Sequence, residues 1–323
     1  MLIKSLLTSL VFSAAVNANT AINTSASHNT KITGTEGNNS SYINNNDSRT
    51  FVSSNKCFKA SVQGTGKPVI LIPGFSNDNR VWLEQEKALK KGYQVHSLSL
   101  SGFAGTATCN YNGKYLNEVT EQILTYIEYN QLNAVSVIGH SMGGLIAMNV
   151  AIQQPTNFKH IIAIDGLPFI GPVYTRSNAT TVSDISYQAN QMRTMYKNAT
   201  PEQITFMTQQ GMRFQTNDSA AKQQILEMAK QSNSIVLGDA IYDVMTTDLR
   251  KQLHKISASL LLIGASGGFN SEPEHTFIRN LYKEQLSDKK DASLIMNTNA
   301  KHFIMFDDGE WLTDQLLNTL GAE

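Results

Sequence analysis

The sequence predicts an α/β fold in which a mostly parallel sheet is covered by helices and carries an inserted, all-helical cap. Three observations lead to this prediction. Apolar runs of strand length alternate with stretches of helical periodicity. The segment between residues 167 and 250 contains helical patterns and no buried strand run. A very short connection around Ser141 joins a buried strand directly to a buried helix.

The composition is that of a globular protein. Of the 323 residues, 41% are hydrophobic, which is enough for a large core. Lys and Arg together number 26, as do Asp and Glu, so the net charge is near zero. A neutral chain creates no positive field that attracts nucleic acid or an anionic membrane, and we expect neither as a partner.

The first 18 residues have the features of a secretory signal peptide. Lys4 precedes an apolar run over residues 5–16, and small residues follow in the spacing of a cleavage site. Because the run is too short to span a membrane, we expect no stable membrane insertion after cleavage and a periplasmic or secreted location. Residues 19–55 are rich in Asn, Ser and Thr, which predicts a flexible leader ahead of a folded domain over residues 56–323.

The chain contains two cysteines, Cys57 and Cys109. Export would place them in an oxidising compartment, where a disulfide would tie the first strand to the loop after residues 95–100. Two buried free thiols are the alternative, and the sequence leaves both open. The ligand spacings of a structural zinc site and the HExxH motif are absent, so we expect neither a metal nor a cofactor.

The first half of the predicted sheet domain contains three strands and two helices. Runs rich in Val, Ile and Leu predict buried strands at residues 69–72, 95–100 and 135–138. Apolar residues at helical spacing predict helices at residues 81–89 and 119–129 between them. Strands that alternate with helices in this way are typical of a parallel sheet.

The same order resumes after an interruption. Residues 160–166 predict a fourth strand, followed by strands within residues 258–266 and 292–298 and a last helix near residues 311–320. Four amphipathic segments lie between about residues 168 and 250, and we interpret them as the helical cap. Pro201 suits the first turn of the second segment, with Thr200 as its N-cap.

The connection around Ser141 lies in the stretch "AVSVIGHSMGGLIAMNVAI", residues 134–152. The strand and the helix crowd the chain there, so residues without a Cβ are needed, and Gly139 and Gly143 provide them. Such a turn holds Ser141 in an exposed and strained position. Strain of this kind indicates a functional residue.

A serine hydroxyl is a weak nucleophile that needs an imidazole to take its proton and a third group to orient that imidazole. His302 is the candidate base because it lies in a loop beyond the last strand and before the final helix. His140, next to the serine, is interpreted as a packing residue that points elsewhere.

Two places in the sequence can supply the acid. Asp165 ends the strand that follows the serine-bearing helix, whereas Glu272 and Glu274 lie in the loop after the strand "SLLLIG". Rigid placement at a strand end favours Asp165, because glycines make the other loop flexible. Asp165 could also be a turn residue ahead of Gly166, as is common for Asp-Gly.

Backbone N–H groups must receive the negative charge that develops on the substrate oxygen. The strand at residues 69–72 ends in Pro73-Gly74, at the same sheet edge as the serine turn. Topology therefore predicts Phe75 N–H and Met142 N–H as the two donors of an oxyanion hole.

Together, "GHSMGG", the preceding "LIPGFSNDNRVW", the inserted cap and the late "KHFIMFDDGEW" resemble the α/β-hydrolase superfamily, in its single-sheet, helical-cap branch. The resemblance extends from about residue 58 to residue 320. It implies that Ser141 is the nucleophile, His302 the base, and Gly74 with Phe75 the oxyanion loop. Many members carry an aspartate after the strand matching "SLLLIG", where this chain has none; some relatives carry it where Asp165 stands.

We therefore expect a secreted or periplasmic serine hydrolase that cleaves a carboxylic ester of a small to medium apolar substrate through an acyl-enzyme on Ser141. The partner would be the small-molecule ester. A serine nucleophile argues against the activities of a dehalogenase or an epoxide hydrolase, because the resemblance associates those enzymes of the same fold with an aspartate at this position. Hydrolysis of an amide, a lactone or a carbon–carbon bond by the same triad remains an alternative, as does a non-catalytic, ligand-binding member of the fold.

Overall fold

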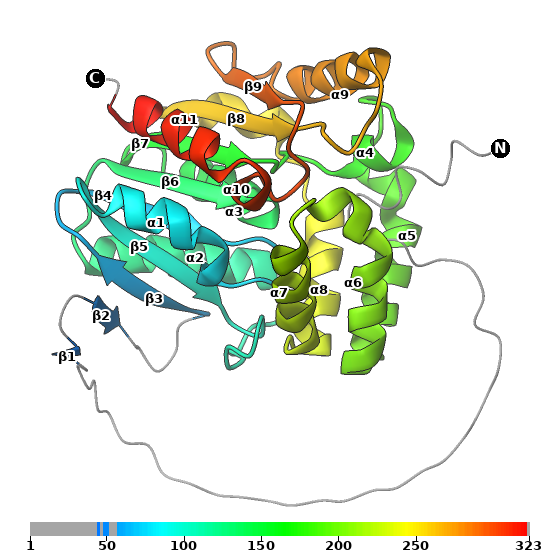
Figure 1. The fold of residues 1–323 in the computed structure, drawn as a ribbon, viewed down its shortest axis with the longest axis horizontal. Helices are drawn as coiled ribbons and strands as arrows, with labels where there is room; N and C mark the ends of the chain where they lie inside the picture. The colour runs from blue at the N-terminus through cyan, green and yellow to red at the C-terminus, as the bar shows by residue number, and fades with distance from the viewer. Residues whose placement is uncertain (1–43, 46–47, 52–56, 322–323) are drawn as a thin grey trace, which may run out of the picture.

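The computed structural model describes residues 44–45, 48–51 and 57–321 (Figure 1). The predicted signal peptide and most of the predicted leader lie outside these residues. A single sheet runs through the described part, with strand order β1-β2-β3-β5-β4-β6-β7-β8-β9. Its strands are β1 (Asn44–Asn45), β2 (Ser48–Phe51), β3 (Phe58–Gln63), β4 (Lys67–Ile72), β5 (Tyr93–Leu100), β6 (Val135–His140), β7 (Phe158–Ile164), β8 (Ser259–Ala265) and β9 (Ser293–Asn297).

The sheet is parallel from β5 to β9 and antiparallel at its other end. β4 pairs in parallel with β5 and β6, and β7, β8 and β9 follow in parallel, as the sequence predicts. β3 pairs antiparallel with β5 and β2 antiparallel with β3. The predicted leader therefore contains two short strands, because the open edge of β3 offers unpaired backbone groups with which an extended polar segment can pair.

Helices cover both faces of the sheet. The 3₁₀ helix η1 and helices α1 and α11 pack on one face, and α2, α3 and α9 pack on the other. Successive residues of β4 alternate between these two cores, with Val69 and Leu71 in one and Ile70 and Ile72 in the other. The elements are η1 (Asn79–Trp82), α1 (Leu83–Leu89), α2 (Tyr115–Tyr129), α3 (Met142–Gln153), α9 (Glu272–Gln285), α10 (Ile304–Asp307) and α11 (Gly309–Gly321).

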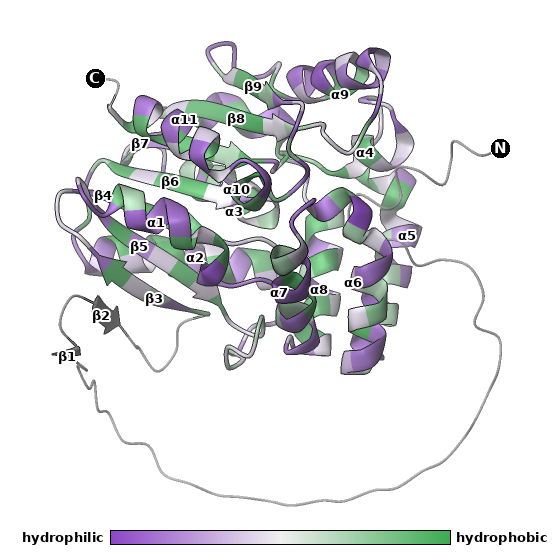
Figure 2. Cartoon of the chain, viewed as in Figure 1, coloured by the Kyte–Doolittle hydropathy of each residue, from purple (hydrophilic) through white to green (hydrophobic). Residues whose placement is uncertain are grey.

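The predicted helical insertion is present between β7 and β8. It consists of α4 (Gly171–Thr175), α5 (Val182–Lys197), α6 (Pro201–Gln215), α7 (Ser219–Lys230) and α8 (Ser234–Thr246), before the 3₁₀ helix η2 (Arg250–Lys255) returns the chain to β8. Thr200 caps α6 and Pro201 occupies its first turn, as predicted. Figure 2 shows hydrophilic and hydrophobic patches side by side on α5 and α6, in contrast to the hydrophobic central strands.

A disulfide joins Cys57, just before β3, to Cys109 in the loop after β5. The structure thus decides between the two alternatives that the sequence leaves open. The bridge spans 52 residues, and in the chain-entropy model closing a loop of this length stabilises the fold by about 4 kcal/mol.

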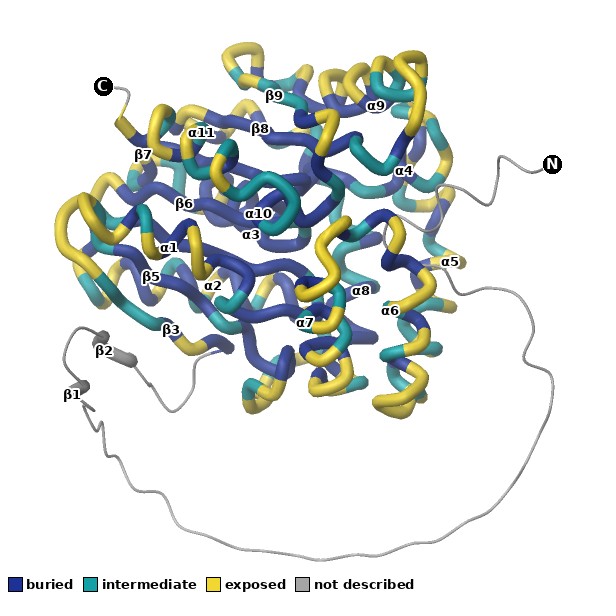
Figure 3. Tube along the Cα trace, in the orientation of Figure 1, coloured by how far each residue is buried: buried dark blue, intermediate teal, exposed yellow. Residues whose placement is uncertain are grey.

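Within the described residues, no helix combines the length and the apolar character that crossing a membrane requires. In that same part of the chain, no three His, Cys, Asp or Glu side chains lie close enough together to hold a metal ion. Figure 3 shows that the deepest burial lies along the central strands, whereas the cap helices expose much of their outer surface.

Candidate active site

Ser141 is the single residue between the end of β6 and the start of α3, and its backbone is strained. Its φ is 54° and its ψ −118°, which is unusual for a residue with a side chain. A Cβ on Gly139 would lie 2.0 Å from the carbonyl oxygen of Gly143, and one on Gly143 would lie 2.3 Å from that of Ile72. The predicted need for glycine at both positions is therefore confirmed.

Several residues with a strained backbone lie at the carboxyl edge of the sheet. Asp165, directly after β7, has a φ of 45°, and Ser76, in the loop after β4, has a φ of 61°. Hydrogen bonds hold two of these turns to neighbouring strands: the Ser141 amide donates to the Ile164 carbonyl at 2.9 Å, and the Asp165 amide donates to the Ile263 carbonyl at 2.7 Å. The surrounding sheet thus holds the strained residues in place.

Asp165 and His302 form a close, buried pair. Oδ2 of Asp165 lies 2.6 Å from Nδ1 of His302, and the two side chains are 2% and 9% exposed. His302 follows β9 in the loop before α10, so the carboxyl ends of two parallel strands bring the pair together. This is the partnership that rigid placement at a strand end predicts for Asp165.

The other carboxylate oxygen of Asp165 is also satisfied. Oδ1 accepts a hydrogen bond from the Ala265 amide at 2.9 Å and from the Tyr282 hydroxyl at 3.0 Å. Burial, followed by the neighbouring Asp165, raises the pKa of Tyr282 well above its ordinary value, so this phenol stays protonated and donates. Three donors thus surround one carboxyl group and fix its position.

The alternative acids face elsewhere. Glu272 is exposed in the first turn of α9, and the Ser271 hydroxyl donates to Glu274 at 2.8 Å. The sequence placed both glutamates in a flexible loop, whereas the structure begins a helix there. Negative charge in a first turn stabilises a helix, which gives these residues a structural role.

His140 packs directly behind His302 rather than pointing away from the site. The two imidazole centroids lie 4.5 Å apart, and Nε2 of His140 lies 3.0 Å from the backbone oxygen of His302. Burial, with a smaller effect of His302, lowers the pKa of His140 well below its ordinary value. His140 is therefore neutral and donates its Nε2–H to that oxygen, which fixes the backbone that carries His302.

One predicted oxyanion donor follows Ser141 directly, and the other lies in the loop after β4. Met142 is the first residue of α3, so its N–H has no acceptor within the helix and lies at the positive end of the helix dipole. Gly74 approaches the serine so closely that a Cβ there would lie 3.2 Å from Cβ of Ser141. Phe75 follows Gly74 and lines the same pocket as Ser141. The role of the two N–H groups stays a prediction.

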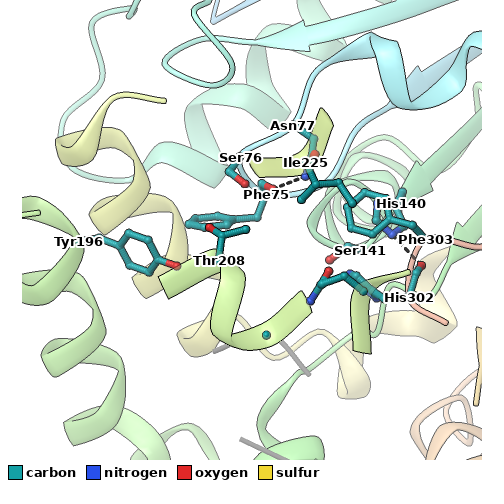
Figure 4. Close-up of a pocket in the computed structure, with 12 residues that line it drawn as sticks. Phe75, Ser76, Asn77, His140, Ser141, Tyr196, Thr208, Ile225, His302 and Phe303 are labelled. Atoms are coloured by element: carbon teal, nitrogen blue, oxygen red, sulfur yellow. Dashed lines mark hydrogen bonds between the residues drawn. The ribbon is translucent and has the colours of Figure 1, made fainter. Parts of the chain in front are cut away.

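Ser141 and His302 open into a pocket of about 50 Å³ beneath the cap (Figure 4). Tyr196 from α5 and Thr208 from α6 line one side, opposite His302 and Phe303. The other lining residues are Phe75, Ser76, Asn77, His140, Gly211, Gln215 and Ile225. The pocket thus combines the residues at the sheet edge with a ceiling that the cap provides.

Comparison with known proteins identifies the family and the fold. Residues 67–312 match the family model described as alpha/beta hydrolase fold. A 128-residue stretch is 30% identical to (E)-2-((N-methylformamido)methylene)succinate hydrolase of Acinetobacter baylyi, covering 40% of this chain and 46% of that protein. A 106-residue stretch is 27% identical to pimeloyl-[acyl-carrier protein] methyl ester esterase of Aliivibrio fischeri, covering 33% and 39%. The chain thus matches less than half the length of these two relatives.

The match to solved structures of similar fold extends over nearly the whole length of those structures. An esterase from Exiguobacterium antarcticum superposes with a TM-score of 0.65 at 17% identity, covering 85% of this chain and 96% of that one. An enol-lactonase from Burkholderia xenovorans also gives 0.65, at 13% identity, covering 87% and 100%. At these identities the likeness establishes the fold alone.

Proposed function

The chain belongs to the alpha/beta hydrolase fold family, and from this premise we propose that it is a serine hydrolase that cleaves a carboxylic ester through an acyl-enzyme on Ser141. One observation carries the proposal: the 2.6 Å contact between Asp165 and His302 at the sheet edge where Ser141 is held in a strained turn. An imidazole held by a carboxylate in the same pocket as a half-buried serine is the arrangement from which nucleophile activation proceeds.

Each residue then has one task. Asp165 accepts the Nδ1–H of His302, which leaves Nε2 to take the proton of the Ser141 hydroxyl as its oxygen attacks the ester carbonyl. The N–H groups of Phe75 and Met142 receive the oxyanion. His302 then passes its proton to the leaving alcohol, the acyl group stays on Ser141, and water activated by the same histidine releases the acid.

The preference for esters is also part of the proposal. The methyl ester esterase among the relatives supports it. The same triad hydrolyses amides, lactones and carbon–carbon bonds in other proteins of this fold, so purified protein should be assayed on matched esters, amides and lactones. Faster turnover of an amide or a lactone than of the matched ester would contradict ester specificity and leave the serine mechanism intact.

Export to the periplasm or the medium belongs to the proposal as well. The signal-like residues 1–18 and a disulfide typical of oxidising compartments support it. N-terminal sequencing of the extracytoplasmic protein should find a chain that begins near Asn19. An intact Met1 in that fraction would contradict cleavage.

Labelling with a fluorophosphonate probe tests whether the serine is activated. The wild-type protein should become labelled and Ser141→Ala should not, because the probe reacts with an activated serine. Ser287→Ala, which removes an exposed serine on the surface, serves as the matched control and should label like the wild type. Equal labelling of wild type and Ser141→Ala, or no labelling of the folded wild type, would end the serine-hydrolase proposal.

A further inference from the structure

We propose that the pocket selects esters of compact, uncharged acyl groups of about two to four carbons and rejects both long acyl chains and acyl groups that end in a carboxylate. The inference rests on the proposed function and names its substrate class. It follows from the volume of the pocket, from the side chains that set this volume, and from the charges around it.

The volume is small. An apolar cavity of about 150 Å³ holds one benzene ring, so a pocket of about 50 Å³ holds a group of a few carbons. An acetyl or propionyl group fits such a space. A long alkyl chain does not, unless the cap moves away from the sheet.

Two cap helices set this volume. Ile225 of α7 lines the pocket while being only 2% exposed, and it packs in the same core as Met212 and Met228. This packing holds its side chain against the pocket. Gly211 of α6 lines the pocket too, although glycine inside a helix is about 1 kcal/mol less favourable than alanine. The absence of a side chain there leaves room for the acyl group.

Among the described residues, the lining of the pocket offers no Lys or Arg side chain as a partner for an anionic acyl group. None of the twelve lining residues in the described chain is Lys, Arg, Asp or Glu. In α5, Lys197 follows the lining residue Tyr196 in the chain, and it contacts Asp239 at 2.8 Å, as Arg193 also does. A carboxylate buried without a partner cation is strongly disfavoured, so an acyl group must enter uncharged.

The test compares kcat/KM for p-nitrophenyl acetate, butyrate and octanoate. The wild type should prefer acetate over octanoate by about 100-fold or more, because one methylene that a pocket does not accommodate costs about 10- to 200-fold. Ile225→Ala should reduce this preference to about tenfold or less, mainly by faster octanoate turnover. Ile235→Ala removes an isoleucine that is 49% exposed on the cap and does not line the pocket, and it should leave the profile unchanged.

Gly211→Leu provides a second variant if Ile225→Ala does not fold. It should fill the pocket and lower turnover of butyrate more than that of acetate. A second arm compares methyl butyrate with monomethyl succinate, which have similar length but differ by a terminal carboxylate. The wild type should prefer methyl butyrate by about 100-fold.

Equal wild-type turnover of acetate and octanoate, or of methyl butyrate and monomethyl succinate, would overturn the inference while ester hydrolysis itself stands. Failure of both pocket variants to change the chain-length profile would overturn the role of Ile225 and Gly211. A folded wild type with no ester turnover and no fluorophosphonate label would instead refute the proposed function on which the inference rests.

Discussion

The carboxyl edge of the sheet and the helical cap meet over one pocket, but they hold their side chains in different ways. At the sheet edge, Asp165 has hydrogen-bond partners on both oxygens, and Ser141 occupies a strained turn with a φ of 54°. The cap presents side chains from amphipathic helices that also expose large residues such as Tyr187, at 70%, and Phe206, at 62%. The contrast separates reaction chemistry, which depends on strand ends, from selectivity, which depends on exchangeable helix side chains.

The largest effect is expected at the sheet edge. Ser141→Ala should lower kcat of ester hydrolysis by about 10⁶-fold, the scale seen when a triad nucleophile is removed from a serine protease. Loss of one hydroxyl leaves no large cavity, so the thermal midpoint should change little. Turnover within tenfold of the wild type would show that the sheet edge does not carry the chemistry.

Asp165→Asn should lower kcat by about 10⁴-fold, because an amide in place of the carboxylate favours the wrong tautomer of His302. Glu272→Gln, an exposed acid of the same sheet edge, should leave kcat within about twofold of the wild type. The reverse result would assign the acid to α9 and reduce Asp165 to a turn residue.

Tyr282→Phe should lower kcat by about tenfold, because it removes one hydrogen bond to the Asp165 carboxylate. Loss of this donor also loosens the carboxylate that orients His302, so the effect should appear in kcat with KM nearly unchanged. Tyr187→Phe, on the exposed surface of α5, is the matched control. A rise in KM with an unchanged kcat would contradict a role for Tyr282 in positioning Asp165.

In the cap, we expect a substitution to change the free energy of unfolding rather than the rate of hydrolysis. Asp243 of α8 accepts a hydrogen bond from the Leu116 amide at 3.0 Å, at the start of α2. Burial raises its pKa to about 6, although this bond and Arg193 act in the opposite direction, while Asp239 adds to the rise. Since the folded state holds this proton more tightly than the unfolded state, its stabilising contribution is complete below about pH 4 and is lost as pH rises through 6.

Asp243→Asn keeps an acceptor for the Leu116 amide and removes the titration. Between pH 4 and pH 7, the free energy of unfolding of the wild type should therefore fall by about 2 kcal/mol relative to this variant, with kcat nearly unchanged. Urea titrations at each pH measure the difference. Parallel pH curves for the two proteins would contradict the coupling between α8 and α2.

The residues at the carboxyl edge of the sheet can be predicted from the sequence because local patterns of apolar residues determine where each strand ends. Buried strands appear as short apolar runs, and the residues that follow them must meet at one edge of a parallel sheet. Ser141, Asp165 and His302 are all found by this argument, although they are far apart in the chain. The glycine requirement at Gly139 and Gly143 likewise follows from crowding between neighbouring elements.

The contacts by which residues from distant parts of the chain hold the site in place could not be predicted in the same way. Tyr282 reaches Asp165 from 117 residues away, on helix α9, whose first residues the sequence predicts to be a loop. Ser271 with Glu274 three residues later is the pattern of a helix start and could have revealed α9. The contact of His140 with the backbone of His302 depends on packing in three dimensions, for which the sequence contains no periodic signal.

The most direct test of the account is to capture the acyl-enzyme. Wild-type protein mixed with p-nitrophenyl acetate, quenched in acid within the first turnovers and digested, should yield the peptide containing Ser141 with one added acetyl group, located by mass spectrometry. Asp165→Asn should form this adduct far more slowly. An acetyl group on another residue, or hydrolysis with no acylated peptide at any time point, would contradict a serine nucleophile supported by His302 and Asp165.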